Sequence, residues 1–171
     1  MSSLHQLLKR FNVWIHADDC GISPSSTIAI VELLQNQRLD GFSLLANGAD
    51  YANAVSKLKA INPQAISVHL NLMEGRPLTS GRLLSRTLTN GQFSKDFIAM
   101  LRFVSLLSAD DRKVLCQEIL VEMQAPVAKV KADFPDTDLS IDSHQHFHLL
   151  PVFSSALVSL IAISSHRLTL R

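Results

Sequence analysis

Residues 11–21 read FNVWIHADDCG, and this stretch decides the fold class. It joins an apolar run to two carboxylates and to a glycine that favours a turn. The run FNVWIHA (11–17) is short and rich in β-formers, which predicts a buried strand. Asp18 and Asp19 follow it directly, and glycine and proline within the next five residues end the strand. The stretch therefore predicts a strand whose carboxyl end carries two acidic side chains.

The rest of the chain continues the alternation of apolar strands and amphipathic helices. Ser25 or Ser26 is expected to cap a helix that runs to about Gln37. We expect further strands over 42–46, 65–70 and 139–143, and the start of a fifth strand over 167–171. Helices are expected over 51–60, 94–107, 110–132 and 151–163, the third of them kinked or split at Pro126. A long loop is expected over 74–93. This alternation predicts an α/β fold with a parallel sheet whose strands are buried on both faces.

Composition limits the class of protein and its partners. The 171 residues are 47% hydrophobic and 18% charged, which is typical of one globular domain, and we take 1–171 as a single domain. The net charge of +1 gives no electrostatic reason to expect nucleic acid or a membrane surface as a partner. Two distant cysteines, the lack of a signal-peptide core and the lack of a span of roughly 18 apolar residues favour the cytoplasm.

Carboxylates and imidazoles stand at the ends of three predicted strands. They are Asp18 and Asp19, then His69, and finally the histidines of HQHFH (144–148). In parallel α/β folds the carboxyl ends of strands gather at one edge, where active sites form. A mononuclear metal hydrolase needs a few such ligands from distant sequence and one free base. The pattern therefore predicts a metal hydrolase.

Each of these groups also has a structural interpretation. One aspartate can cap the next helix and the other can be solvated. Adjacent residues of an extended chain point to opposite sides, so we expect the two carboxylates to have different tasks. His69 can be a hydrogen-bonded core histidine instead of a ligand.

The histidine tract sets a geometric limit on metal binding. If the strand continues through it, His144 and His148 lie roughly 13 Å apart and cannot share an ion, so at most two of the three histidines bind directly. The others would orient the substrate, supply a proton or bind in the outer shell. The alternative is a surface tract with incidental metal binding.

A cysteine and several arginines near these motifs could also take part in the chemistry. Cys20 adjoins the aspartate pair, but with no histidine paired to it in sequence we interpret it as a packing residue. Three arginines of the long loop can contact a polar substrate or lie in solvent: Arg76, Arg82 and Arg86. We assign substrate binding to Arg76 and to Asn71, which follows the third predicted strand.

Three motifs resemble those of the YdjC-like carbohydrate deacetylases, the family that contains chitooligosaccharide deacetylases. HADDCG (16–21) resembles the family's opening motif, although Cys20 stands where members often have Phe. VHLN (68–71) with EGRPL (74–78) resembles its second segment, and DSHQHFHLLP (142–151) its third; the strand and turn at 42–48 also fit. The order and spacing agree from about residue 12 to residue 153, and three ordered motifs are far more specific than one.

The resemblance implies a distorted (β/α) barrel of the TIM type and the hydrolysis of an N-acetyl group from an acetylated amino sugar or chitooligosaccharide. Carried over by position, Asp19, His69 and His144 would bind one divalent metal ion, Mg²⁺ or Zn²⁺. Asp18 would be the general base. His146 and His148 would lie at the rim of the site as candidate proton donors.

A complete barrel of this type has roughly 250 residues. We therefore expect a partial barrel, lacking the C-terminal third and ending near strand five. Open strand edges and an apolar inner face would then favour a homodimer or larger assembly through the exposed edge.

Two rival functions remain open at this point. One is a non-catalytic metal-binding protein that dimerises through its edge. The other is a metal-dependent phosphoesterase, which the near-neutral charge and the lack of a glycine-rich phosphate loop disfavour.

Overall fold

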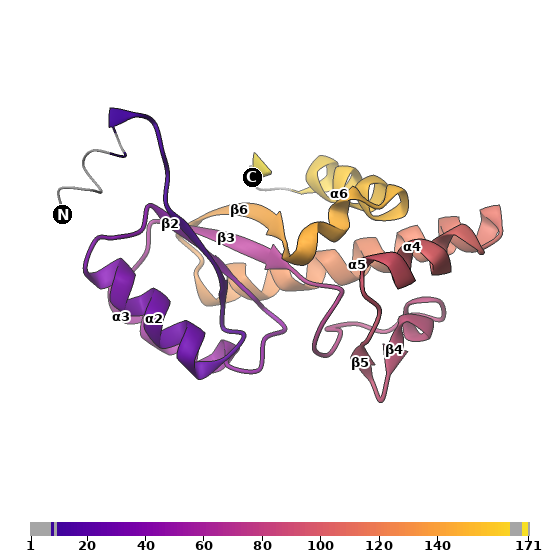
Figure 1. The fold of residues 1–171 in the computed structure, drawn as a ribbon, viewed down its shortest axis with the longest axis horizontal. Helices are drawn as coiled ribbons and strands as arrows, with labels where there is room; N and C mark the ends of the chain where they lie inside the picture. Colours follow the sequence, from indigo (N-terminus) through magenta and orange to yellow (C-terminus); the bar gives the residue numbers. More distant parts are fainter. Residues whose placement is uncertain (1–7, 9, 165–168, 171) are drawn as a thin grey trace.

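The computed structural model describes residues 8, 10–164 and 169–170, and its centre is one parallel sheet (Figure 1). The strands run in the order β1-β2-β3-β6-β7. Their bounds are β1 His16–Cys20, β2 Gly41–Leu44, β3 Ala65–Leu70, β6 Asp138–Ser143 and β7 Thr169–Leu170. All four pairings within this sheet are parallel, which confirms the α/β class and the parallel sheet.

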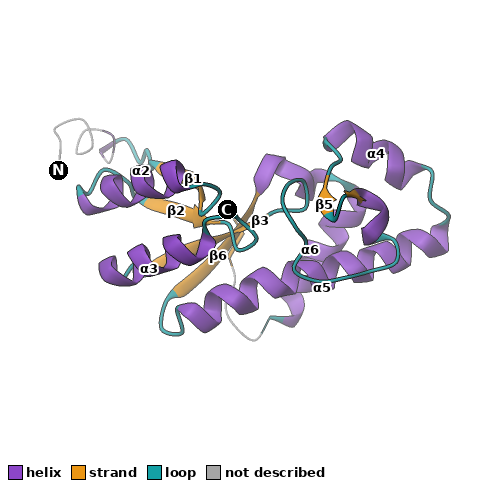
Figure 2. Ribbon diagram, turned by 90° about the horizontal axis from the view of Figure 1, so that it is seen from below, coloured by secondary structure: helices purple, strands orange, loops and turns teal. Residues whose placement is uncertain are grey.

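Five longer helices connect and cover these strands (Figure 2). They are α2 Pro24–Gln35, α3 Tyr51–Ile61, α4 Phe97–Ser105, α5 Ala109–Asp133 and α6 Pro151–Ile163. The long loop after β3 holds a 3₁₀ turn, Leu84–Thr87, and a small hairpin of β4 Leu88–Thr89 and β5 Gln92–Phe93. A second 3₁₀ segment, His144–Leu149, joins β6 to α6.

Two expectations about the helices are corrected. Ser23, rather than Ser25 or Ser26, caps α2, because Pro24 begins the helix and the Ser23 hydroxyl accepts a hydrogen bond from the Ser26 amide. Neither aspartate of the pair is therefore the cap. Pro126 lies buried inside α5 and does not split it, since the helix continues to Asp133; the alternative, a kink at Pro126, stays a prediction.

The first strand begins later than the sequence pattern predicted. Phe11 and Trp14 are exposed at 72% and 70%, and β1 starts only at His16. The reason is pairing: β2 begins at Gly41, directly opposite His16, so the paired ladder starts there, one residue after the bond from the Asp40 amide to the Ile15 carbonyl. β1 also ends later than predicted, at Cys20, so Asp18 and Asp19 lie inside it and not after it.

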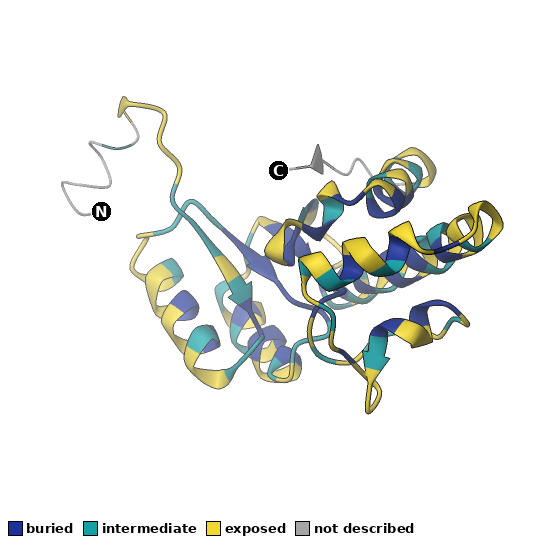
Figure 3. Ribbon diagram, turned by 45° about the vertical axis from the view of Figure 1, so that its right-hand side comes forward, coloured by how far each residue is buried: buried dark blue, intermediate teal, exposed yellow. Residues whose placement is uncertain are grey.

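The strands of the sheet have one apolar face and one polar face. The apolar residues pack with the helices in one core cluster: Phe42, Leu44, Ile66, Val68, Leu70, Leu139 and Ile141. The residues that alternate with them are polar: Ser43, Ser67, His69, Ser140 and Asp142. β2 and β3 are buried on both faces, as expected, but the expectations of continuous apolar runs and of an apolar inner face were wrong. Figure 3 shows the exposed positions on the outward sides of the helices and along the chain before β1.

The sheet has the strand order of a barrel wall, but its closure is not seen. Among the described residues β1 pairs only with β2 and β7 only with β6. The barrel stays a prediction. Association through an open strand edge also stays a prediction, and of the two reasons given for it only the open edge remains, because the inner face is polar. None of the described helices combines the length and apolar character needed to cross a lipid bilayer.

Candidate functional site

A β-bulge in β1 sets the directions of the two adjacent carboxylates. Ala17 pairs with Phe42 and Cys20 pairs with Leu44, so three steps along β1 lie opposite two steps along β2. At the bulge Asp19 has φ +65°, a left-handed conformation that is uncommon outside glycine. Bulges often redirect a side chain beside an active site. Here the bulge lets both carboxylates contact the polar face of the sheet, which corrects the expectation that they point to opposite sides.

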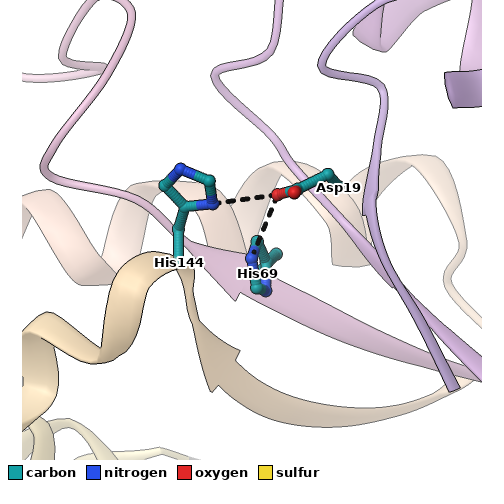
Figure 4. A group of neighbouring side chains, drawn as sticks. All are labelled: Asp19, His69 and His144. Carbon is teal, nitrogen blue, oxygen red and sulfur yellow. Dashed lines mark hydrogen bonds and ion pairs between the residues drawn. The ribbon is translucent and has the colours of Figure 1, made fainter.

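Asp19 forms a compact group with two histidines (Figure 4). Its Oδ1 lies 2.9 Å from Nδ1 of His144 and 3.3 Å from Nε2 of His69. The imidazole rings are 5.4 Å apart between centroids and stand at 80° to each other. The His69 side chain is only 4% exposed and that of His144 10%, whereas Asp19 is 35% exposed. The group is therefore reachable from solvent mainly past Asp19.

The other ring nitrogen of His69 is held by Asp142, its register partner on β6. His69 Nδ1 and Asp142 Oδ1 are 2.6 Å apart. A carboxylate accepts but does not donate, so Nδ1 carries the hydrogen and Nε2 presents a lone pair toward Asp19. Burial raises the pKa of Asp142, but hydrogen bonds from His16, His69 and Ser43 outweigh this effect and hold it well below its usual range.

His144 is held in the same manner by a carboxylate from the loop after β3. Its Nε2 lies 3.3 Å from Oε1 of Glu74, which also accepts a 2.9 Å hydrogen bond from the Gln145 side-chain amide. The 2.9 Å contact with Asp19 makes Nδ1 of His144 a donor in the absence of a metal, and Nε2 can accept from the Gln145 amide at 3.3 Å. A metal bound at Nδ1 would require the other tautomer, in which Nε2 donates to Glu74. The two histidines thus offer opposite ring nitrogens to the same carboxylate.

The donor set fits a divalent metal ion. Two imidazole nitrogens and one carboxylate oxygen lie within 4.8 Å of one another, so all three can bind one ion when both nitrogens are unprotonated. Carboxylates on the far nitrogens are the usual outer partners of metal-binding histidines. Nitrogen ligands favour zinc or a similar transition ion, while magnesium prefers oxygen. The residues therefore suit the metal that the motif resemblance implied.

Asp18 belongs to a second group beside the first. Its Oδ1 lies 3.6 Å from His16 Nε2, which is also 3.6 Å from Asp142 Oδ2. The Ser43 hydroxyl lies among the three, 2.7 Å from His16, 3.1 Å from Asp18 and 2.5 Å from Asp142. Asp142 contacts both groups, so the two neighbouring sites form one hydrogen-bonded network.

The histidine tract leaves the strand direction at once. β6 ends at Ser143, and Gln145 and His146 have positive φ values of 52° and 55°. His146 is exposed, and its ring stands 6.0 Å from that of His148, whose Nδ1 contacts the Ser143 hydroxyl. Burial, with the nearby His146, lowers the pKa of His148. Of the tract, only His144 belongs to the Asp19 group.

The two residues assigned to substrate binding lie on the loop that approaches His144. Asn71 is buried; its side-chain oxygen accepts from the amides of Met73 and Glu74, and its NH₂ donates to Asn47 and to the Glu74 carbonyl. These bonds occupy the amide, so Asn71 shapes the loop, and its substrate contact stays a prediction without support from this geometry. Arg76 is exposed, two residues beyond Glu74, and its assignment also stays a prediction.

Two glutamates of α5 fix the rest of that loop. Glu122, 3% exposed, accepts hydrogen bonds of 2.8 and 2.7 Å from the amides of Leu78 and Thr79. Glu118, one turn earlier, accepts bonds of 2.8 and 2.7 Å from Leu83 and Leu84. These contacts hold the loop against α5.

The remaining reactive side chains near the site have structural partners. Arg82 pairs with Asp111 at 2.8 Å, and Arg86 lies over the ring of Phe103. Cys20 is fully buried, and burial raises the pKa of its thiol to about 12, so it is not a nucleophile at neutral pH.

Four residues of the network had no role in the sequence prediction: His16, Ser43, Glu74 and Asp142. A signal for two of them was present. Ser43 and Asp142, like His69, alternate with apolar residues, which is the period-two pattern of a strand with one polar face. Glu74 had no such signal, because its position depends on the conformation of a loop.

Comparison with known proteins gives the family. The family model described as YdjC-like protein matches residues 12–171. The chain is 29% identical over 152 residues to proteins of Mus musculus and Homo sapiens that are both named carbohydrate deacetylase, covering 86% of this chain and 47% and 46% of theirs. It is 26% identical over 137 residues to a chitooligosaccharide deacetylase of Escherichia fergusonii, covering 80% of this chain and 50% of that protein.

A solved structure supports the fold. A crystal structure from Enterococcus faecalis, described as a "putative cellobiose-phosphate cleavage protein", superposes with a TM-score of 0.71 at 21% identity, covering 91% of this chain and 57% of that one. The chain spans about half the length of the curated relatives it matches. The family model covers nearly all of the sequence, and the chain therefore belongs to the YdjC-like protein family.

Proposed function

We propose that this chain is a metal-dependent hydrolase that removes N-acetyl groups from acetylated amino sugars or chitooligosaccharides. The observation that carries the proposal is the convergence of Asp19, His69 and His144 in a chain of the YdjC-like family. Relatives named carbohydrate deacetylase and chitooligosaccharide deacetylase support the substrate class.

The three converging side chains would hold the metal. A divalent ion bound there supplies two effects, a lowered pKa for a bound water and polarisation of the acetamide carbonyl. Asp142 would keep the Nε2 lone pair of His69 directed at the metal, and Glu74 would accept the hydrogen on Nε2 of His144 when Nδ1 binds the metal.

Asp18 is the proposed general base. It lies one residue from Asp19, its side chain is 60% exposed, and it can accept a proton from an attacking water. The leaving amine must gain a proton, and His146 or His148 is the proposed donor, both being in the segment directly after His144. The loop that carries Glu74 and Arg76 would form a wall for the sugar.

The test combines metal analysis with a product assay. The purified chain is examined by elemental analysis, and acetate release from diacetylchitobiose is measured with and without a chelator. One equivalent of metal and chelator-sensitive acetate release support the proposal. An Asp19→Asn variant is the control, because it removes a ligand charge while asparagine tolerates the left-handed backbone.

Two other outcomes would contradict the proposal. Metal binding without acetate release from any acetylated amino sugar tested would leave a metal-binding protein. Release of phosphate from a phosphorylated sugar, with no acetate from the acetylated one, would make the chain a phosphoesterase.

A further inference from the structure

Ser43 lies at the centre of the second group of charged side chains. It is fully buried, and its Oγ contacts His16, Asp18 and Asp142 at 2.7, 3.1 and 2.5 Å. The ligand atoms of those three residues lie within 4.8 Å of one another, which by spacing alone would suit an ion. The hydroxyl oxygen already occupies the position from which an ion would bind all three. The geometry therefore points to a hydroxyl-centred network in place of a second metal.

Asp18 needs such a restraint. Its side chain is 60% exposed, and an exposed aspartate moves readily between rotamers. The side-chain contacts that orient it are the Ser43 hydroxyl at 3.1 Å and His16 at 3.6 Å. Since a general base acts only when its oxygen is directed at the attacking water, whatever fixes this carboxylate contributes to the rate.

We propose that Ser43 is a positioning residue for Asp18, and that through Asp142 it couples the orientation of the base to that of His69. The effect on turnover rests on the proposed deacetylase function; the effect on the Asp18 side chain does not. A serine hydroxyl donates one hydrogen and accepts others. It can therefore accept from His16 while its one hydrogen is shared between the two carboxylates, mainly with Asp142 at 2.5 Å and as a longer branch with Asp18 at 3.1 Å.

The neighbouring strand provides a matched control. Ser67 is the register partner of Ser43 on β3 and is 3% exposed, but its hydroxyl has no hydrogen-bond partner among the described residues. Ser67→Ala removes the same atoms from the same row of the sheet without breaking a contact. A buried hydroxyl without a partner is lost at little or no cost.

The experiment compares four variants by kinetics and by crystallography. Ser43→Ala and the size-matched Ser43→Cys are expected to lower kcat for acetate release by about 10- to 100-fold with KM unchanged. Ser43→Thr, which keeps the hydroxyl, restores most of kcat, and Ser67→Ala behaves as the wild type. High-resolution crystal structures should show Asp18 in one orientation in the wild type and in Ser67→Ala, and in several orientations in Ser43→Ala and Ser43→Cys.

The outcomes separate this inference from the proposed function. Wild-type kcat in both Ser43→Ala and Ser43→Cys, or equal losses in these variants and Ser67→Ala, would overturn it. A wild type that binds metal but releases no acetate refutes the proposed function alone. The crystal structures then decide the role of Ser43, because an unchanged single orientation of Asp18 in Ser43→Cys overturns the inference without reference to activity.

Discussion

Asp18 and Asp19 are adjacent in sequence but belong to two groups with opposite character. Around Asp19, two histidine nitrogens converge, and the other nitrogen of each ring lies beside a second carboxylate. Around Asp18, the centre is occupied by the hydroxyl of Ser43. The first group has its three potential ligand atoms close enough to bind one ion, while in the second a hydroxyl links the charged side chains by hydrogen bonds.

This contrast would explain how one short motif supplies both the proposed metal ligand and the proposed base. A ligand works best when its partners also direct lone pairs at the metal, whereas a base must stay accessible and free of the metal. The β-bulge at Asp18–Asp19 produces both conditions from neighbouring residues, because it brings the two carboxylates to the same face at different positions. The predictions below test whether the two groups are as distinct as their geometry indicates.

The largest effect is expected from Asp19→Asn. The change removes the charged side chain of the Asp19 group, so we expect metal binding to be abolished. Elemental analysis and calorimetric titration with Zn²⁺ measure this loss. Asp18→Asn is the matched control and should retain one equivalent of metal. Equal loss of metal in both variants would erase the distinction between the groups.

Asp18→Asn should instead reduce the rate. Loss of a general base typically costs about 10²- to 10⁴-fold, so kcat for acetate release should fall within that range while metal content stays the same. The measurement is steady-state kinetics on metal-loaded protein. A variant that keeps wild-type kcat would assign the base to another residue.

Asp142 is the link between the groups, so its substitution should affect both. In Asp142→Asn the size is retained but the carboxylate that holds His69 is lost, and metal affinity should fall by about 10- to 100-fold. Calorimetric titration measures this change. Asp138→Asn, an exposed position at the start of the same strand, is the control and should bind metal as the wild type does. Unchanged affinity in Asp142→Asn would show that His69 is oriented by packing alone.

The sequence predicted which residues meet in the Asp19 group better than the geometry around them. Residue type and position near strand ends indicated the candidates, and the family resemblance singled out Asp19, His69 and His144 by motif position. The extent of β1 did not follow, because a strand exists only where a neighbour pairs with it, and β2 begins opposite His16. The β-bulge in β1 could not be predicted from the sequence either, because it depends on the register between β1 and β2.

The polar face shows a different kind of miss. FSL (42–44) and ISVHL (66–70) alternate apolar and polar residues, yet both were interpreted as continuous apolar runs. Serine is small and only weakly polar, so such a run resembles a strand that is apolar on both faces. The network around Ser43 became visible only when register placed it beside Ser67 and brought Asp142 opposite His69.

The smallest effect is expected from Glu74→Gln, which tests whether the two histidines are held equally well. Glu74 is 50% exposed and lies 3.3 Å from His144, whereas Asp142 is 16% exposed and lies 2.6 Å from His69. Exposed ion pairs contribute about 0.2–1 kcal/mol, so metal affinity in Glu74→Gln should fall by no more than about fivefold. Titration under the conditions used for Asp142→Asn makes the two losses comparable. A loss of affinity as large as that of Asp142→Asn would mean that the contact between Glu74 and His144 is shielded from water when metal is bound. The loop after β3 would then contribute directly to metal affinity.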